Sequence, residues 1–327
     1  MSLLNTLDID KAHLILQPFI TQTPLVTNEA INSLVSAKVY FKLENLQKTG
    51  SFKIRGATYK ISLLSTKQKQ KGIVTYSSGN HAQAVALASL NQGIEATIVM
   101  PDNAPKIKIK NTKSYGVNIV LYNPKTENRE AIGNEIALET GKTLIKPYDD
   151  IDIITGQGTV GKEITEQLKE INTIPNIYLC CVSGGGLIAG SSYYIKSNFP
   201  EVESYSVEPE NFNDTLLSLK RRYITPNKNT KSSICDALLV SQPGEITFKI
   251  NQATLKGGLD VSDWEVRKTI KILAETLKVM VEPGGAVAAA ALLTKKIEVK
   301  NKIVVVILSG GNIDSDLFSQ IITKNYE

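Results

Sequence analysis

Residues 177–195 read IYLCCVSGGGLIAGSSYYI and give the clearest indication of the fold class. A short apolar run, three glycines and a helix-length segment follow one another, which predicts a strand, a tight turn and a helix. The N–H groups of consecutive glycines can converge on one small volume beside the positive end of the helix dipole. We therefore predict an anion site here, for phosphate. A turn that requires positive φ angles is the alternative interpretation.

The same alternation of short apolar runs and helix-length segments continues along most of the chain. The expected strands cover residues 39–43, 72–76, 96–100, 117–122, 143–146, 177–182, 204–208 and 303–308. The expected helices cover residues 80–91, 127–140, 158–171, 186–197, 263–277 and 285–295. Apolar strands between helices are typical of parallel sheets that are covered on both faces. We therefore expect an α/β protein with two open, twisted, mostly parallel sheets flanked by helices.

The length and the order of these segments predict the domain organisation. A chain of 327 residues suits two compact units better than one. No internal repeat or low-complexity linker is visible, so strands from both ends of the chain are expected to share one sheet. We expect a large domain of residues 1–47 and 148–327, into which a small domain of residues 48–147 is inserted.

Four loops with unusual chemistry follow apolar runs of the sequence. In open parallel sheets, ligands bind at the loops that lead from the carboxyl end of a strand into the next helix. The loops are Ser77-Ser78-Gly79-Asn80-His81, Ser183-Gly184-Gly185-Gly186, Ser309-Gly310-Gly311-Asn312 and, after residues 279–281, Glu282-Pro283-Gly284-Gly285. A single cofactor with a phosphate, a ring nitrogen and an aldehyde would use the first three of these loops together with Lys53.

A lysine with apolar neighbours supplies the partner for such an aldehyde. Residues 50–57 read GSFKIRGA, and they place Lys53 between Phe52 and Ile54 at the start of an expected helix. An amine enclosed by such neighbours loses hydration, which disfavours its charged form. A neutral lysine is a nucleophile that can form a Schiff base. The alternative is a buried aliphatic stem whose ammonium group reaches water.

The composition excludes several classes of protein. No apolar run approaches the roughly 20 residues that span a bilayer, and the amino-terminal segment has no signal-peptide pattern. Three cysteines, two of them adjacent, do not predict a disulfide framework. Two histidines are too few for a His-based zinc site and leave little room for a Ser-His-Asp hydrolase. We expect a cytoplasmic protein with no membrane partner.

The net charge of +5 raises the question of nucleic-acid binding. The densest basic cluster is Lys106, Lys108, Lys110 and Lys113. It has no stacking platform and matches no DNA-binding motif. We interpret it as a solvated helix face and expect no nucleic-acid partner.

A dinucleotide-binding dehydrogenase is the main competing interpretation. Gly184, Gly186 and Ala189 fit the dinucleotide fingerprint, and Glu208 ends the next expected strand, near the position of a ribose-binding acid. That motif leaves Lys53, the paired serines and the loop at Ser309 unexplained. The NAD alternative therefore accounts for less of the chain.

Seven stretches in order resemble the fold-type II family of pyridoxal-5′-phosphate (PLP) enzymes, specifically the serine/threonine dehydratases and serine racemases. The resemblance covers nearly the whole chain. The stretches are Thr23-Pro24-Leu25, LENLQKTGSFKIRGA (43–57), SSGNHAQAVA (77–86), ITGQGTVG (154–161), VSGGGLIAG (182–190), VEPGGAVAAAALL (281–293) and VILSGGNID (306–314). This family binds PLP between its two domains, so the resemblance implies the same here.

The resemblance also implies roles for individual residues. It makes Lys53 the Schiff-base lysine, directs Asn80 to the ring hydroxyl and directs Ser309 to the pyridine nitrogen. Residues 183–187 would hold the phosphate, with Ser183 where relatives commonly carry glycine. The full expected cofactor set is Phe52, Lys53, Asn80, Ser183, Gly184, Gly185, Gly186, Leu187, Glu282 and Ser309. The expected substrate set is Ser77, Ser78, Asn80 and His81, with a helix N-cap for Ser78 and a surface position for His81 as alternatives.

The implied activity is β-elimination from hydroxy amino acids. A neutral serine at the ring nitrogen does not hold it protonated, which favours loss of a β-leaving group over transamination. The resemblance predicts a dehydratase of L-threonine or L-serine, in which Lys53 removes the α-proton. Ser78, commonly alanine in dehydratases, would supply a second proton donor and a racemase side activity. A primary serine racemase and a 3-hydroxyaspartate dehydratase are the alternatives.

The last residue of the expected strand 204–208 and the segment after it match the divalent-cation site of the family. Glu208, the carbonyl of Phe212 and Asp214 would bind magnesium or calcium through oxygen atoms. An acidic loop that caps the following helix is the alternative. The family also implies a homodimer that takes a small amino-acid substrate. Since the chain ends soon after the loop at Ser309, we expect no appended regulatory domain.

Overall fold

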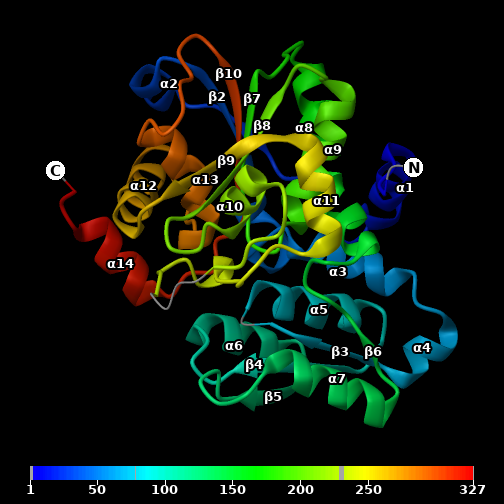
Figure 1. The fold of residues 1–327 in the computed structure, drawn as a ribbon. Coiled ribbons are helices and arrows are strands. Elements are labelled where there is room, and N and C mark those ends of the chain that lie inside the picture. The colour runs from blue at the N-terminus through cyan, green and yellow to red at the C-terminus, as the bar shows by residue number, and fades with distance from the viewer. Residues whose placement is uncertain (1–2, 78, 228–231, 327) are drawn as a thin grey trace.

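A computed structural model describes residues 3–77, 79–227 and 232–326 (Figure 1). Its larger sheet has six strands in the order β1-β2-β10-β7-β8-β9. All neighbours in it are parallel except β1 and β2. These strands are β1 (Leu25–Val26), β2 (Lys38–Leu43), β7 (Ile177–Cys181), β8 (Glu203–Pro209), β9 (Leu255–Val261) and β10 (Ile303–Leu308). Strands from both ends of the chain thus share one sheet, as the sequence predicts.

The smaller sheet has four parallel strands in the order β5-β4-β3-β6. They are β3 (Ile73–Tyr76), β4 (Ala96–Pro101), β5 (Asn118–Tyr122) and β6 (Thr143–Leu144). Figure 1 shows this sheet below the larger one. The α/β fold class with two mostly parallel sheets is therefore confirmed, whereas domain boundaries at residues 48 and 147 stay a prediction.

Helices cover both sheets. They are α1 (Thr6–Leu16), α2 (Glu29–Val35), α3 (Lys53–Ser62), α4 (Thr66–Lys71), α5 (Asn80–Asn91), α6 (Lys106–Ser114), α7 (Arg129–Thr140), α8 (Ile151–Glu170), α9 (Gly186–Asn198), α10 (Asp214–Arg221), α11 (Glu245–Thr254), α12 (Asp263–Thr276), α13 (Pro283–Leu293) and α14 (Ser315–Thr323). Short 3-10 turns are η1 (Glu44–Leu46), η2 (Lys48–Gly50) and η3 (Asp236–Leu238). In the larger half, α8, α9 and α13 pack against the strands in one hydrophobic core.

The two-residue period of the small sheet shows how its faces are filled. Ile73, Ile98 and Met100 pack in one core with apolar side chains of α3 and α5. The intervening Val74 and Val99 pack in a second core with α7. Successive side chains of a strand point to opposite faces, so strands such as β3 and β4, which are buried at every position, need a helix on each side.

Glycines let α8 approach its neighbours closely. A Cβ atom on Gly156 would lie 2.7 Å from Cα of Gly56 in α3, and one on Gly161 would lie 2.5 Å from the carbonyl oxygen of Ser191 in α9. These contacts offset the cost of glycine in a helix. They also explain an error in the prediction: α8 starts at Ile151 instead of residue 158, and the Asp150 side chain caps it by accepting from the N–H groups of Asp152 and Ile153.

The sequence prediction missed two strands. β1 has two residues, and β9 reads LKGGLDV, whose glycines and aspartate are unfavourable in strands. The apolar run at residues 279–281, by contrast, is not a strand. The expected strands of residues 39–43, 72–76, 96–100, 117–122, 143–146, 177–182, 204–208 and 303–308 are all present, with small differences at their ends.

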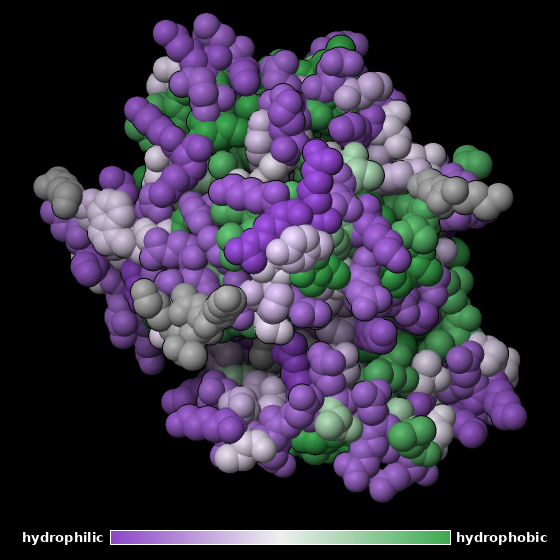
Figure 2. Space-filling model, in the orientation of Figure 1, coloured by the Kyte–Doolittle hydropathy of each residue, from purple (hydrophilic) through white to green (hydrophobic). Residues whose placement is uncertain are grey.

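The face of the molecule in Figure 2 is largely hydrophilic, and apolar side chains occur on it in small separate groups. None of the helices within the described residues is long and apolar enough to cross a membrane.

Candidate active site

A cavity lies where loops at the carboxyl ends of strands in both sheets meet. Its lining includes the side chain of Lys53, the loop at residues 183–187 and Ser309. Residues from the loop after β3 (Ser77, Asn80 and His81) and the start of α13 (Glu282) complete this part of the wall. The structure thus brings most of the sequence-predicted residues together around one volume.

Lys53 begins α3, and its side chain enters the cavity. Its Nζ atom donates a hydrogen bond of 2.7 Å to the carbonyl oxygen of Pro147 and lies 5.3 Å from the ring centroid of Phe52. Loss of hydration lowers the pKa of Lys53 to about 8. The neutral amine, which nucleophilic attack on an aldehyde requires, is then far more populated near physiological pH than it is in an ordinary lysine.

The glycine loop joins β7 to α9. Gly185 has a φ angle of 97°, in the left-handed region that favours glycine. A Cβ atom on Gly184 would lie 2.2 Å from the ring of Tyr148, so that residue has no room for a side chain. The hydroxyl of Thr247 donates to the carbonyl oxygen of Gly184 at 2.6 Å, which fixes the loop from the α11 side.

Two polar side chains at this loop are suited to a further ligand. The hydroxyl of Ser183 and the amide of Asn251 are buried, and neither has a hydrogen-bond partner among the described residues. A Cβ atom on Gly185 would lie 2.9 Å from Nδ2 of Asn251, so that amide is adjacent to the loop. Buried polar groups are normally satisfied. Together with the start of α9, they fit a phosphate.

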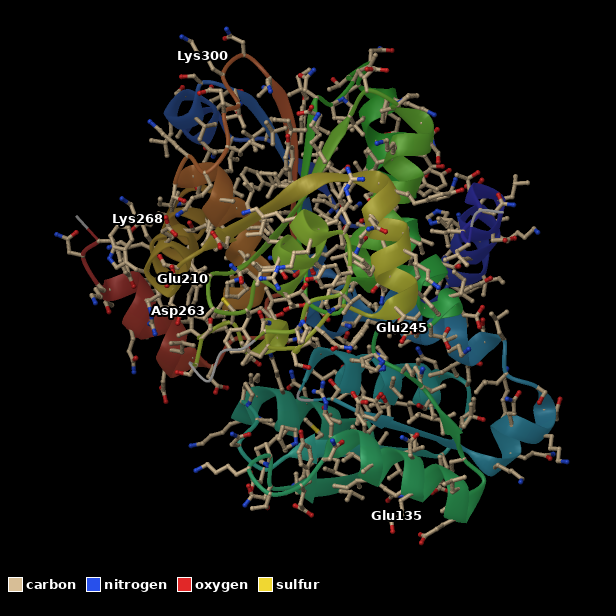
Figure 3. The ribbon with its side chains drawn as sticks, viewed as in Figure 1. Glu135, Glu210, Glu245, Asp263, Lys268 and Lys300 are labelled. Atoms are coloured by element: carbon tan, nitrogen blue, oxygen red, sulfur yellow. The ribbon has the colours of Figure 1, made fainter. Side chains whose placement is uncertain are left out.

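The segment before α8 is fixed at the edge of the cavity. The Asp149 carboxylate accepts hydrogen bonds from the backbone N–H groups of Glu245, Ile246 and Thr247, in the first turn of α11. Figure 3 shows Glu245 at that end of α11, near the boundary between the two halves. Because Tyr148 precedes Asp149, this cap also holds the Tyr148 ring against the glycine loop.

Asn80 opens α5 and lies opposite the glycine loop. Its Nδ2 atom donates to Oε1 of Glu282, and its Oδ1 atom accepts from Nδ2 of Asn312 at 2.9 Å. Glu282 also forms a 2.8 Å ion pair with Lys108, whose amine pairs with Asp236 at 2.7 Å. These contacts join α6 of the smaller half to the larger half beside the cavity.

Lys108 corrects one prediction. The sequence suggested that Lys106, Lys108, Lys110 and Lys113 form a solvated helix face, but Lys108 is 1% exposed. Thr112, one turn later, is also buried, so both lie on the inner face of α6. A signal was available in this i, i+4 spacing, although the acidic partners Asp236 and Glu282 are far away in the sequence.

The loop after β3 contains the expected substrate residues. The Ser77 hydroxyl accepts from the N–H of Gly79 at 3.1 Å. Ser78 lies outside the described residues, so its predicted role is unchanged. His81 is 1% exposed, which contradicts the surface alternative. Burial, reinforced by the charge of Lys53, lowers the pKa of His81 to about 3 and keeps the ring neutral.

Ser309 follows β10 at the far side of the cavity from the small sheet. Its carbonyl oxygen accepts from the N–H of Phe52 at 3.2 Å, which links it to the residue before Lys53. Its hydroxyl accepts from the thiol of Cys181 at 3.1 Å. No local feature distinguishes Cys181 in the sequence, because it lies inside an apolar strand.

Arg129 is a second cavity residue that the sequence analysis missed. It begins α7, and its guanidinium lies 5.7 Å from the ring centroid of Tyr76. No carboxylate within the described ranges forms an ion pair with it. A cation in a cavity without an acidic partner is available to an anionic ligand.

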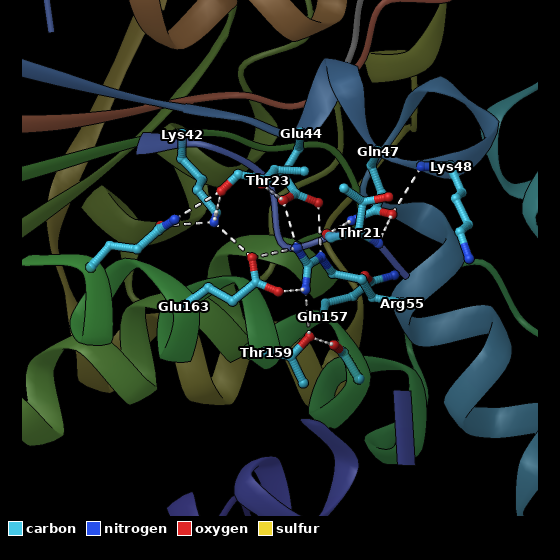
Figure 4. Close-up of polar contacts among 12 residues, drawn as sticks. Thr21, Thr23, Lys42, Glu44, Gln47, Lys48, Arg55, Gln157, Thr159 and Glu163 are labelled. Carbon is cyan, nitrogen blue, oxygen red and sulfur yellow. Dashed lines mark hydrogen bonds and ion pairs between the residues drawn. The ribbon is translucent and has the colours of Figure 1, made fainter. Parts of the chain in front are cut away.

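A buried network of charges supports the start of α3 (Figure 4). Arg55 donates to both oxygens of Glu44, at 2.7 and 2.8 Å, and to both oxygens of Glu163, at the same two distances. Lys42 pairs with Glu163 at 2.7 Å and donates to the carbonyl oxygen of Thr23. These four charged side chains are 0% exposed. The network fixes α3 two residues after Lys53.

Of the predicted cation residues, Glu208 lies near the end of β8, and Phe212 and Asp214 follow the strand. Both oxygens of Glu208 accept backbone N–H groups, from Thr215 and Leu216 at 2.8 Å, so Glu208 caps α10. Asp214 accepts from Asn227 through Oδ1, and its Oδ2 atom has no partner among the described residues. Burial raises the pKa of Glu208 well above its usual range and that of Asp214 to about 7. The described residues contain no group of three or more His, Cys, Asp or Glu side chains that could hold a metal ion.

Comparison with known proteins connects this site to an enzyme family. The family model "Pyridoxal-phosphate dependent enzyme" matches residues 16–310. The L-threo-3-hydroxyaspartate ammonia-lyase of Saccharomyces cerevisiae is 40% identical over 94% of this chain and 93% of its own length. A catabolic L-threonine dehydratase of Staphylococcus aureus is 39% identical over 96% of this chain and 91% of its own length. The structure of maize serine racemase is 36% identical, with a TM-score of 0.90 over 97% of this chain and 96% of that one.

Proposed function

The chain belongs to the family of pyridoxal-phosphate-dependent enzymes, and from this premise we propose that it converts L-threonine, L-serine or both to the 2-oxo acid and ammonia. The observation that carries the proposal is the cavity in which the Lys53 amine, the glycine loop and the Ser309 hydroxyl meet. An ammonia-lyase, a dehydratase and a racemase among the similar proteins support this class of reaction.

The donors around the cavity fit PLP. We assign the phosphate to Ser183, the N–H groups of residues 184–187 and Asn251, because these groups are available beside the positive end of α9. Lys53 would bond to the aldehyde, Asn80 would meet the ring hydroxyl and Ser309 the ring nitrogen. Phe52 and Glu282 line the same wall. When bound, PLP supplies an aldehyde that bonds to amines and a ring that withdraws electrons from the α-carbon.

The protein groups then orient the substrate and move its protons. Ser77 and the N–H groups of the first turn of α5, which have no partner within the helix, would hold the substrate carboxylate. Lys53 Nζ accepts the α-proton, and its lowered pKa keeps it neutral enough to do so. Ser309 offers a neutral hydroxyl instead of a carboxylate, which favours loss of the β-hydroxyl over transamination. The neutral His81 beside Lys53 adds no charge that would oppose proton transfer.

We propose racemisation as a side activity. It requires a proton donor on the face opposite Lys53, and Ser78 is assigned that role from its place in the sequence. Ser78→Ala should reduce formation of D-serine by a factor of about 10²–10⁴, the typical worth of general acid–base assistance. Turnover of L-threonine should remain. Equal loss of both activities would contradict the assignment and leave Ser78 a positioning role.

L-threo-3-hydroxyaspartate is a second candidate substrate. The Arg129 guanidinium lines the cavity and has no ion-pair partner among the described residues. The second carboxylate of a dicarboxylic substrate would form an ion pair with this guanidinium. The similarity to the yeast ammonia-lyase supports the same candidate.

Purified protein supplied with PLP tests these proposals. We expect 2-oxo acid and ammonia in equal amounts from L-threonine, L-serine or L-threo-3-hydroxyaspartate, and a chiral assay detects D-serine. Comparison of kcat/KM for the three substrates shows which of them the enzyme prefers. If none of the three gives 2-oxo acid in protein that binds PLP, the proposed reaction is wrong.

We also propose a divalent cation at Glu208, the carbonyl oxygen of Phe212 and Asp214. Two adjacent buried carboxylates with raised pKa values, and the unpartnered Oδ2 atom of Asp214, support it. Magnesium and calcium both prefer such oxygen ligands.

A homodimer and a cytoplasmic location complete the proposal. The side chains of Leu7 and Leu14, which are seven residues apart on α1, are 62% and 65% exposed. They lie on one face of the helix, which supports an interface with a second copy. Light scattering measures the assembly directly, and a monomer at working concentration would contradict it.

A further inference from the structure

Cys181 ends β7, and its side chain lies in the cavity wall beside Ser309. The thiol donates to the Ser309 hydroxyl, with 3.1 Å between Sγ and Oγ. The two residues come together because β7 and β10 are parallel neighbours whose carboxyl ends meet at one edge of the sheet. Both side chains are nearly buried, and both line the cavity that contains the Lys53 amine.

The backbone of Ser309 is fixed independently of this contact. Its carbonyl oxygen accepts from the N–H of Phe52, and the next residue, Gly310, pairs with Ser51 in an isolated β-bridge. The hydroxyl, by contrast, can rotate about its C–O bond. Among the residues that the structure describes, Cys181 is its one hydrogen-bond partner. The direction of the Ser309 hydroxyl proton therefore depends on whether the Cys181 thiol donates a hydrogen bond to Oγ.

A serine hydroxyl has one proton to donate and two lone pairs that accept. When the thiol donates to Oγ, it uses one lone pair and leaves the hydroxyl proton free to point into the cavity. Ser309 then acts as a donor toward an unprotonated nitrogen. Without the thiol, the hydroxyl can turn and accept from a protonated nitrogen instead.

We propose that Cys181 is a positioning residue, which orients the Ser309 hydroxyl so that Ser309 donates to the ring nitrogen of PLP. The inference rests on the proposed function, in which Ser309 meets that nitrogen. Cys181 touches no reacting atom and acts through Ser309. When the Ser309 hydroxyl is held as a donor, the ring nitrogen stays unprotonated, which favours β-elimination over transamination.

The adjacent cysteine provides a matched control. Cys180 is fully buried in the same strand, and its thiol donates to the backbone carbonyl oxygen of Cys181, not to the Ser309 hydroxyl. Successive side chains of a strand point to opposite faces of the sheet. Cys180→Ala thus removes an equal number of atoms from the core without touching Ser309.

The experiment compares Cys181→Ala, Cys181→Ser and Cys180→Ala in the full-length protein reconstituted with PLP. The readouts are the dissociation constant of PLP and the pH titration of its visible absorption band. Cys181→Ala should weaken PLP binding about three- to tenfold, the worth of one ordinary hydrogen bond, and should shift the titration. Cys181→Ser keeps a donor and should restore both, while Cys180→Ala should match the parent protein.

A double-mutant cycle tests whether Cys181 acts through Ser309. In the Ser309→Ala background, the Cys181→Ala change should have no further effect on the titration. The inference is wrong if Cys181→Ala keeps the parent titration, or if Cys181→Ser has the same defect as Cys181→Ala. If Cys181→Ala does not fold, the Cys181→Ser variant alone tests the inference. A pH titration of the PLP absorption band that is shifted from that of the parent protein in Cys181→Ser would then contradict the inference. Failure of the parent protein to bind PLP would instead contradict the proposed function.

Discussion

The amine of Lys53 donates to the carbonyl oxygen of Pro147 at 2.7 Å. This contact ties the first residue of α3 to the segment that returns from the small sheet to α8. A neutral carbonyl accepts from the amine without supplying the negative charge that would hold it protonated. Burial therefore dominates, and the pKa of Lys53 falls to about 8 from its ordinary value of 10.5.

The lowered pKa predicts how the rate of PLP attachment depends on pH. Attack on the aldehyde requires the neutral amine, so the initial rate should rise with pH and level off above about 8. An ordinary lysine would keep gaining reactivity up to a pH near 10.5. Stopped-flow absorbance of PLP-free protein mixed with PLP measures the profile. A rate that still rises steeply at pH 10 would contradict the desolvated amine.

The buried network around Arg55 predicts a large effect on stability. Arg55→Met leaves Glu44 and Glu163 without the guanidinium that pairs with both, and breaking a buried pair in this way typically costs about 3–5 kcal/mol. Urea unfolding measures the loss. Lys38→Met is the control, because its ion pair with Glu29 is exposed and screened by solvent, so its loss should barely change the stability. Similar losses in the two variants would refute the importance of the network.

The cation site predicts a pH-dependent response to magnesium or calcium. The pKa of Asp214 is about 7 in the folded state and 3.8 ordinarily, so the folded state binds a proton more readily. Without a cation, the free energy of unfolding should therefore fall as pH rises from about 4 to 7. A bound cation stabilises the ionised carboxylates by mass action, so added magnesium or calcium should raise the melting temperature more at pH 8 than at pH 5.

Variants of two acidic residues separate this site from general ionic effects. Asp214→Asn should abolish the cation response and weaken the pH dependence between 4 and 7, to which the buried Glu208 still contributes. Asp102→Asn changes an exposed carboxylate and should leave both as in the parent protein. If added magnesium or calcium does not change the melting temperature of the parent protein at pH 8, Glu208 and Asp214 bind no cation and only stabilise the start of α10.

Arg129 predicts the choice between monocarboxylic and dicarboxylic substrates. If its guanidinium binds a second carboxylate, Arg129→Met should reduce kcat/KM for L-threo-3-hydroxyaspartate about 10- to 100-fold, since a hydrogen bond to a charged group contributes about 1.5–3 kcal/mol. Turnover of L-serine should change much less. Lys146→Met is the control, because Lys146 is an exposed cation outside the lining of this cavity. Parallel losses for both substrates would assign Arg129 to the shared α-carboxylate or to the fold.

The site residues that could be predicted are those whose role is indicated by their immediate neighbours in the sequence. The three glycines after an apolar run predict a turn, and the position of Lys53 between Phe52 and Ile54 predicts a desolvated amine. Each signal lies within a few residues of the sequence. The strand positions followed from apolar runs whose neighbours are helices. Those signals require no knowledge of contacts between distant parts of the chain.

The missed residues acquire their roles through tertiary contacts. Lys108 is buried because Asp236 and Glu282 meet it from the other half of the molecule. Cys181 looks like an ordinary strand residue until β10 brings Ser309 beside it. The start of α8 was misplaced at residue 158 because Gly156 is unfavourable in a helix, whereas in the structure this glycine permits close packing against α3.

The most direct test of the account is the covalent site of PLP. Protein reconstituted with PLP, reduced with borohydride and digested should yield one modified peptide, with the cofactor on Lys53. Lys53→Ala should yield none and should form no 2-oxo acid from any of the three candidate substrates. Cofactor fixed to another lysine, or near-parent turnover by Lys53→Ala, would contradict the central claim.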